Sequence, residues 1–145
     1  MEEANAIGPS PLRRAARLDL VPVVLIADNE RTLLELLRDI LEDARFRVLT
    51  ATNGQEALTL AETTVPDVLV TDVAMPRLDG FGLVRAVRGL YPSMPIIVIS
   101  GDDRYAGRSV EDVAAELGVA ATFMKPFDLT VLPEAVRSVV RPLET

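Results

Sequence analysis

The chain has 145 residues, of which 49% are hydrophobic and 26% are charged, and its formal net charge is −7. This length and composition indicate one compact domain with a core of ordinary size, and they exclude a disordered tail or a small scaffold stapled by disulfides. Because cysteine and histidine are both absent, disulfides, thiolate nucleophiles, zinc sites built from Cys and His, Ser-His-Asp triads and phosphohistidine are excluded as well.

The first 21 residues differ from the remainder of the chain. They carry Pro9 and Pro11, followed by three arginines at helical spacing, Arg13, Arg14 and Arg17. We interpret residues 1–21 as a flexible or partly helical N-terminal extension, with a docking helix as the alternative. Residues 22–145 are predicted to form the folded domain.

From Pro22 onward, short apolar runs alternate with segments of helical periodicity. The apolar runs predict five strands, at residues 23–27, 46–50, 67–71, 95–100 and 121–124. The first helix is the clearest, since apolar side chains recur at steps of three and four residues through about Ala44. Asn53 and Glu56 resemble a capping box that opens the second helix, which is predicted to end near Glu62.

The third helix follows a loop, residues 74–80, and Tyr91-Pro92 ends it because the residue before proline leaves the α region. Four of its apolar side chains are predicted to share a face: Phe81, Val84, Val87 and Leu90. The fourth helix is predicted at about residues 106–117, closed by Gly118. Thr130 is predicted to cap the final helix, with Pro133 in the first turn. Five strands alternating with five helices predict a doubly wound α/β fold with helices on both faces of the sheet.

Polar residues follow four of the predicted strands. Asp28 and Asn29 follow the first strand, Asp72 the third, Ser100 ends the fourth, and Lys125 follows the fifth. Each could serve as a turn or cap residue. Ligands in such folds bind outside the carboxyl ends of the strands, so we predict that these side chains converge on one rim. Lys125 is the one lysine among 15 basic residues, which is consistent either with chance or with a need for a compact ammonium there.

The sequence strings LIADNE, VTDVAMPRLDG, VISG and FMKPF occur in this order between about Val23 and Val140. In order and spacing they resemble the receiver domain of bacterial two-component response regulators. The resemblance implies a flavodoxin-like five-stranded parallel sheet in the order 2-1-3-4-5, flanked by five helices. It also implies a signalling protein that accepts a phosphoryl group, rather than an enzyme acting on a separate substrate.

By position, the resemblance implies that Asp72 takes the phosphoryl group from a phosphohistidine of a sensor histidine kinase or a histidine phosphotransfer protein. Asp28, Asn29, Asp72 and the backbone carbonyl of Ala74 would then hold Mg²⁺. Lys125 and Ser100 would neutralise and hydrogen-bond the transferring oxygens. The resemblance further implies a cis peptide between Lys125 and Pro126, although cis bonds make up only about 5–6% of X-Pro bonds in general.

Two positions depart from the family pattern. Asn29 stands where a second acidic metal ligand is usual, which predicts Mg²⁺ binding weaker by about 1–3 kcal/mol than in an Asn29→Asp variant, with Glu30 as a candidate to compensate. Thr122 stands where an inward-turning Tyr or Phe is common. Phe123 is predicted to point to the opposite face of its strand, so it does not replace that aromatic residue.

The output is predicted to be contact with a downstream protein target, because the sequence ends at Thr145, soon after the last predicted helix. A stand-alone receiver in the cytoplasm is therefore expected. Net negative charge and few aromatic residues argue against direct binding to nucleic acid, and no apolar run is long enough to cross a membrane. Two alternatives stay open: a pseudo-receiver that works without phosphorylation, and a haloacid-dehalogenase-like phosphatase, which would need an acid where Ala74 stands.

Overall fold

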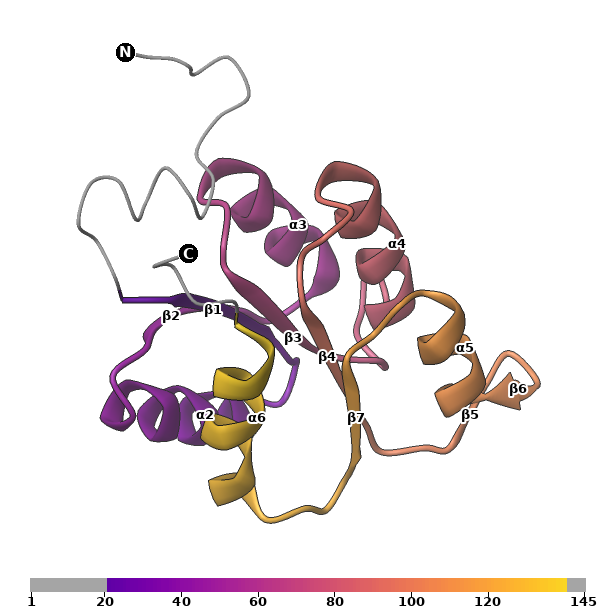
Figure 1. Ribbon diagram of the computed structural model, residues 1–145. Helices are drawn as coiled ribbons and strands as arrows, with labels where there is room; N and C mark the ends of the chain where they lie inside the picture. The colour runs from indigo at the N-terminus through magenta and orange to yellow at the C-terminus, as the bar shows by residue number, and fades with distance from the viewer. Residues whose placement is uncertain (1–20, 141–145) are drawn as a thin grey trace.

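Five parallel strands lie between two layers of helices in the computed structural model, which describes residues 21–140 (Figure 1). The interpretation of residues 1–20 lies outside the described residues. The strands of this sheet are β1 (Val23–Ala27), β2 (Arg47–Ala51), β3 (Val68–Asp72), β4 (Ile96–Ser100) and β7 (Ala121–Met124). The α-helices are α2 (Arg31–Asp43), α3 (Gly54–Thr63), α4 (Gly80–Leu90), α5 (Val110–Glu116) and α6 (Leu132–Val139).

The strand order β2-β1-β3-β4-β7 confirms the predicted order, because β7 is the fifth strand of this sheet along the chain. The three central strands are buried along their whole length, as expected of apolar runs covered on both faces. The outer strands β2 and β7 are partly exposed. Because all the strand pairings are parallel, the carboxyl ends of the five strands lie at the same edge of the sheet.

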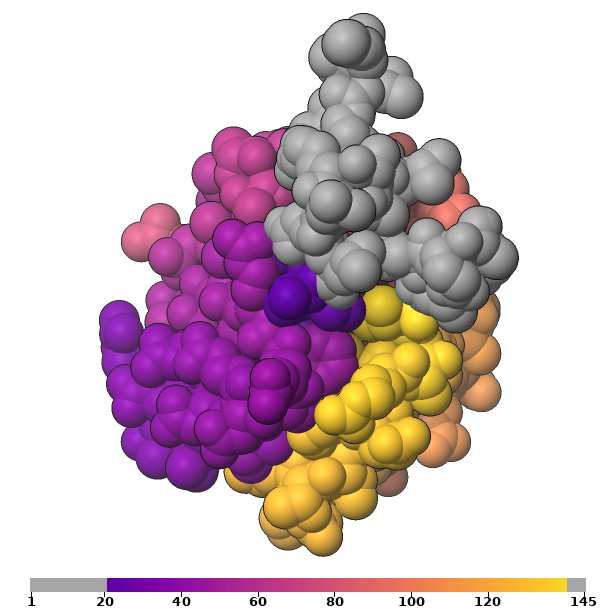
Figure 2. Space-filling model, turned by 60° about the vertical axis from the view of Figure 1, so that its left-hand side comes forward, coloured from indigo at the N-terminus to yellow at the C-terminus, as the bar shows by residue number. Residues whose placement is uncertain are grey.

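Alternate side chains of each strand enter two separate cores. On one face, Leu25, Leu69 and Val98 pack with residues of α3, α4 and α5. On the other face, Val24 and Val70 pack with residues of α2 and α6. Figure 2 shows the violet surface of α2 beside the yellow surface of α6. Within residues 21–140, no helix is long and apolar enough to cross a membrane.

Three predicted strands differ from the structure at their ends. Residues 46–50 are shifted by one against β2, because Phe46 is buried beneath the Arg137 guanidinium rather than paired in the sheet. Residues 67–71 are shifted by one against β3, since the Asp67 side chain accepts a hydrogen bond from the Val23 amide before the strand begins. Residues 95–100 begin one residue before β4. The shift places Asp72 inside β3, as its last residue.

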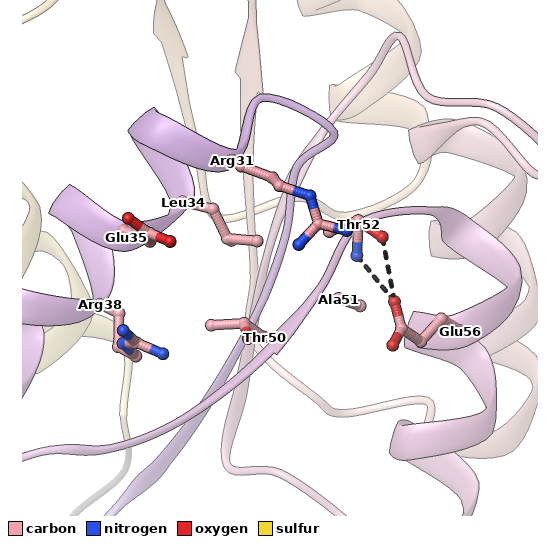
Figure 3. A pocket seen from close by; sticks show the side chains of 8 residues that line it. All are labelled: Arg31, Leu34, Glu35, Arg38, Thr50, Ala51, Thr52 and Glu56. Carbon is pink, nitrogen blue, oxygen red and sulfur yellow. Dashed lines mark hydrogen bonds between the residues drawn. The ribbon is translucent and has the colours of Figure 1, made fainter.

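The capping interactions at the start of α3 are close to those predicted. Asn53 Oδ1 accepts a hydrogen bond from the Glu56 amide at 2.8 Å, which confirms the cap. The Glu56 carboxylate reaches back one residue further than expected and accepts hydrogen bonds from the amide and hydroxyl of Thr52 (Figure 3). Two amides at the helix start are thereby satisfied.

The fourth helix, α5, begins later than the sequence predicts. Residues 104–109 form a two-stranded antiparallel hairpin of β5 (Arg104–Tyr105) and β6 (Arg108–Ser109), and α5 starts only at Val110. Ala106 and Gly107 both have positive φ, 52° and 82°, and so form a tight turn that helical residues could not make. The Ser109 side chain caps α5, and Gly118, with φ 71°, ends it as predicted.

Two further predictions about helices are wrong. Leu90 is 45% exposed, because at about 3.6 residues per turn it lies two and a half turns after Phe81, on the opposite side of α4. Thr130 does not cap α6. Instead, Asp128 caps a short 3₁₀ helix, η1 (Leu129–Val131), and accepts hydrogen bonds from the Thr130 amide and hydroxyl. Pro133 lies in the first turn of α6, as predicted.

Candidate functional site

Two carboxylates are buried side by side at the carboxyl edge of the sheet. Asp28, directly after β1, is fully buried, and Asp72, the last residue of β3, is 5% exposed. Asp28 Oδ1 accepts a hydrogen bond from the Glu30 amide at 2.8 Å, and Asp72 Oδ1 accepts one from the Val73 amide at 2.9 Å. In each residue the second carboxylate oxygen, Oδ2, is left to face Lys125.

Lys125 lies between these carboxylates. Its Nζ is 3.2 Å from Asp28 Oδ2 and 3.5 Å from Asp72 Oδ2, and it donates a hydrogen bond to Glu30 Oε1 at 2.8 Å. The Lys125 amide donates to the carbonyl of Ser100, which ties the end of β7 to the end of β4. The peptide bond to Pro126 is cis, which confirms that prediction. One ammonium therefore serves three carboxylates.

Ser100 ends β4 and is 2% exposed, yet its hydroxyl is not directed at Asp72. Ser100 Oγ donates to the carbonyl of Asp102 at 2.5 Å and accepts a hydrogen bond from the Asp102 amide at 3.1 Å. In this arrangement the hydroxyl is engaged by its own loop. To donate to a group on Asp72 it has to leave the Asp102 carbonyl.

Asn29 and Ala74 are exposed and lie at the mouth of the site. Both line a groove of about 530 Å³ between the loop that follows β3 and the loop that follows β4. Ser100 and Arg104 line it from the β4 side. The structure therefore brings Asp28, Asp72 and Lys125 into contact, and places Ser100, Asn29 and Ala74 around the groove beside them.

Gly80 allows the loop after Asp72 to close tightly. Its amide donates to the carbonyl of Val73 at 2.7 Å, and a Cβ at this position would overlap the carbonyl oxygen of Asp72. Asp79 caps α4, since its Oδ1 accepts a hydrogen bond from the Gly82 amide at the start of the helix. The helix and its loop are thus fixed against the end of β3.

Two residues of the site, Asp72 and Lys125, have pKa values above their ordinary values. Burial, followed by the charge of Asp28, raises the pKa of Asp72, and Lys125 only partly offsets this. Burial alone would lower the pKa of Lys125, but the hydrogen bond to Glu30 and the charges of Asp28 and Asp72 outweigh it, so this pKa also lies above its ordinary value. The ammonium stays charged at neutral pH, whereas ionised Asp72 is held at a cost in stability.

We therefore expect Asp72→Asn to stabilise the metal-free protein at neutral pH, because the amide has no charge to desolvate and is not repelled by Asp28. The penalty of a raised carboxyl pKa is fully present above the folded pKa and absent below the unfolded one, so the gain should shrink as the pH falls into the acid range. Urea unfolding at several pH values measures it. Asp39→Asn on exposed α2 is the control, and a gain that is zero or independent of pH would contradict the prediction.

The oxygen atoms of the site fit a hard divalent cation. Asp28 Oδ2 is buried and accepts no hydrogen bond, although it forms an ion pair with Lys125. Among residues 21–140, no three carboxylate, imidazole or thiolate side chains are grouped to hold a metal. Two carboxylates would thus need neutral oxygens, and the Asn29 amide and the Ala74 carbonyl are of this kind. Mg²⁺ accepts such an all-oxygen set and keeps several waters.

Glu30 is the candidate to compensate at the metal for Asn29. In the structure its carboxylate accepts a hydrogen bond from Lys125, which lowers the pKa of Glu30. Glu30 and Lys125 are 95 positions apart in the sequence. The one feature of the sequence that could have indicated their contact is that Glu30 follows Asp28 by two residues.

A second groove, of about 190 Å³, lies by edge strand β2 and contains none of the predicted site residues. Its lining includes Arg31, Arg38, Glu35 and Glu56 (Figure 3).

The fold and this group of residues define the class of receiver domains. The family described as response regulator receiver domain matches residues 24–137. The chain therefore belongs to the response regulator receiver family. This membership gives no support to the alternative of a haloacid-dehalogenase-like phosphatase.

Individual relatives agree with this assignment. The chain is 32% identical over 121 residues to the alkaline phosphatase synthesis transcriptional regulatory protein PhoP of Bacillus subtilis, covering 83% of this chain and 49% of that protein. It is 37% identical over 124 residues to the transcriptional regulatory protein PrrA of Mycobacterium leprae, covering 83% and 50%. The chain thus spans about half the length of these curated relatives.

Solved structures show the same fold. The chemotaxis response regulator CheY4 of Vibrio cholerae superposes with a TM-score of 0.73 at 29% identity, covering 82% of this chain and 98% of that one. The receiver domain of the Francisella response regulator 1452 gives a TM-score of 0.74 at 30% identity, covering 82% and 96%. Receiver architecture accordingly extends over most of the residues that the structure describes.

Proposed function

We propose that the chain accepts a phosphoryl group on Asp72 from a histidine kinase or a histidine phosphotransfer protein, and signals through contacts with a protein target. The observation that carries the proposal is the position of Lys125 Nζ, 3.2 Å from Asp28 Oδ2 and 3.5 Å from Asp72 Oδ2. A buried carboxylate with an ammonium beside it is suited to receive a second anion. Family membership supports the same reaction class.

In the proposed step, a carboxylate oxygen of Asp72 attacks phosphorus while the bond from phosphorus to the donor nitrogen breaks. The electron pair of that bond leaves with the donor imidazole, which takes up a proton, and Asp72 becomes a mixed anhydride. Two anions about 5 Å apart repel each other by about 3 kcal/mol at an effective dielectric constant of 20. Lys125 offsets this repulsion, and Ser100 can donate a hydrogen bond once it is released from Asp102.

Asp28, Asp72, the amide of Asn29 and the carbonyl of Ala74 are the groups proposed to hold Mg²⁺, which when bound supplies positive charge beside the transferring oxygens. The chain's own part is to hold the nucleophile in place. The Val73 amide fixes Asp72 Oδ1, and the Glu30 amide fixes Asp28 Oδ1. These contacts keep both Oδ2 atoms directed at Lys125.

The proposed output is contact with another protein, from a cytoplasmic location. A net charge of −7 opposes direct binding to nucleic acid. The relatives named as transcriptional regulators are about twice the length of the segment that this chain matches, so their whole activity is not transferred to it. The stand-alone mode of action is likewise part of the proposal.

The second candidate is a pseudo-receiver, an interaction module that does not take up phosphate. Two observations favour it: the neutral Asn29 at the mouth of the site, and the occupation of Lys125 by Glu30. Retention of Asp28, Asp72 and Lys125 in mutual contact favours the phosphoacceptor. Incubation with a small phosphodonor, described next, distinguishes the phosphoacceptor from the pseudo-receiver.

The proposed function predicts a labile adduct of one phosphoryl group after incubation with acetyl phosphate and Mg²⁺, detected by intact mass. The adduct should be missing when a chelator replaces Mg²⁺ and in Asp72→Asn, which keeps the shape of the side chain. Circular dichroism confirms that each sample is folded. A folded wild-type protein without adduct would support the pseudo-receiver instead.

A further inference from the structure

The hairpin of β5 and β6 forms one wall of the groove beside the acceptor site. Arg104 and Tyr105 pair with Arg108 and Ser109, and the Arg104 guanidinium donates to the Gly107 carbonyl at 2.6 Å. Arg108 binds both carboxylate oxygens of Glu116 on α5. The hairpin is thereby fixed to the helix that follows it. Arg104 and Tyr105 line the groove.

Tyr105 joins this hairpin to the loop that follows Asp72. Its hydroxyl donates to Asp79 Oδ2 at 2.9 Å, while Asp79 Oδ1 caps α4 through the Gly82 amide. Its ring meets the buried Phe81 ring edge to face, with centroids 4.8 Å apart at 69°. Burial, and then the hydrogen bond to Asp79, raise the pKa of Tyr105, and the neighbouring Arg85 only partly offsets this, so the phenol stays protonated and is the donor to Asp79 at neutral pH.

The same loop holds the hydroxyl of Ser100. Ser100 Oγ exchanges hydrogen bonds with the amide and carbonyl of Asp102, and Asp102 Oδ1 accepts one from the Arg104 amide at 3.0 Å. Arg104 is the residue before Tyr105. A continuous series of contacts therefore runs from Ser100 through Asp102 and Arg104 to Tyr105, and ends on Asp79.

We infer that the Tyr105–Asp79 hydrogen bond is a latch that stabilises the arrangement in which Ser100 is turned toward Asp102, away from the acceptor. The inference rests on the proposed function, because Ser100 has to leave the Asp102 carbonyl to donate to an anion on Asp72. The latch holds Tyr105 and thereby the neighbouring Arg104, whose amide is hydrogen-bonded to Asp102 Oδ1. Asp102 is therefore hindered from moving away from Ser100. Occupation of the acceptor site is in turn transmitted to the hairpin and to α5. Tyr105 is thus a positioning residue that acts through Ser100.

Tyr105→Phe tests the latch, since it removes the hydroxyl and keeps the ring against Phe81. The probe is beryllofluoride with Mg²⁺, a stable mimic of an aspartyl phosphate, and its affinity is measured by ¹⁹F NMR titration. Loss of one opposing hydrogen bond should make the variant bind the probe about three- to tenfold more tightly than wild type. Tyr91→Phe is the matched control, because the Tyr91 hydroxyl also donates to a single acceptor, the Ala61 carbonyl at 2.9 Å, away from the groove.

A double-mutant cycle shows whether the effect acts through Ser100. In a Ser100→Ala background there is no hydroxyl to redirect, so adding Tyr105→Phe should leave the affinity for beryllofluoride unchanged. Persistence of the gain in that background overturns the inference, as does an equal gain in Tyr91→Phe or no gain in Tyr105→Phe. If wild type binds beryllofluoride and Tyr105→Phe binds it equally well, the latch is contradicted and the proposed function is retained. If wild type does not bind beryllofluoride at all, both the proposed function and the latch are contradicted.

Discussion

Lys125→Met is expected to destabilise the protein by roughly 2–4 kcal/mol at neutral pH and to slow phosphoryl uptake by roughly 10²-fold or more. The physical reason is that Asp28 and Asp72, both buried, share this ammonium and would be left as neighbouring like charges. The Lys125 side chain is 19% exposed, so water reduces the cost below that of a fully enclosed pair. Urea unfolding without Mg²⁺ gives the free energy, and timed intact-mass measurements with acetyl phosphate give the uptake.

Two companion variants separate charge from shape at this position. Lys125→Arg keeps the charge on a wider, planar group, so it should retain most of the stability but not the uptake. Adding Asp72→Asn to Lys125→Met removes one of the stranded charges and should restore part of the lost stability. Unchanged stability in Lys125→Met would contradict the central role given to this residue.

Asn29→Asp is expected to bind Mg²⁺ more tightly by about 1–3 kcal/mol, because a carboxylate adds a charge where the amide supplies only a dipole. Asn29 is exposed at the mouth of the site, beside Asp28, so the new carboxylate can reach a cation held there. Isothermal titration calorimetry with Mg²⁺ measures the difference. Tighter binding would show that Asn29 weakens the metal site without abolishing it.

Asn53→Asp is the matched control for the added charge. Asn53 caps α3 through its side chain, and aspartate is an equally good cap, so the fold should be retained while the net charge changes by the same amount. Its affinity for Mg²⁺ should equal that of wild type. Equal affinity of the Asn29→Asp variant and wild type would show that residue 29 does not contribute to metal binding.

The sheet and the order of its strands could be predicted because continuous apolar runs are needed wherever strands are covered on both faces. The rule that ligands bind at the carboxyl ends of parallel strands placed Asp28, Asp72 and Lys125 at one edge. The cis peptide before Pro126 came from the family resemblance, since the general frequency of cis X-Pro bonds favours trans. Composition contributed one independent indication, the single lysine.

The hairpin, the Glu30–Lys125 hydrogen bond and the hydrogen-bond partner of Ser100 could not be predicted. Strands of two residues leave no alternation to detect, and the positive φ of Ala106 has no signal of its own in the sequence. The Tyr105–Asp79 and Glu30–Lys125 hydrogen bonds join residues 26 and 95 positions apart, and they depend on side-chain conformations that only packing determines. The resemblance implies that Ser100 hydrogen-bonds the transferring oxygens; in the structure its hydroxyl donates to the Asp102 carbonyl of its own loop.

The central claim is that Asp72 is the residue that becomes phosphorylated. Reduction of an acyl phosphate with borohydride converts the aspartate into homoserine, which marks the position covalently. Trypsin then releases the peptide between Arg47 and Arg77, residues 48–77, in which fragmentation can separate Asp67 from Asp72. We predict homoserine at position 72 alone; homoserine at another carboxylate, or none in a folded protein treated with acetyl phosphate and Mg²⁺, would contradict the account.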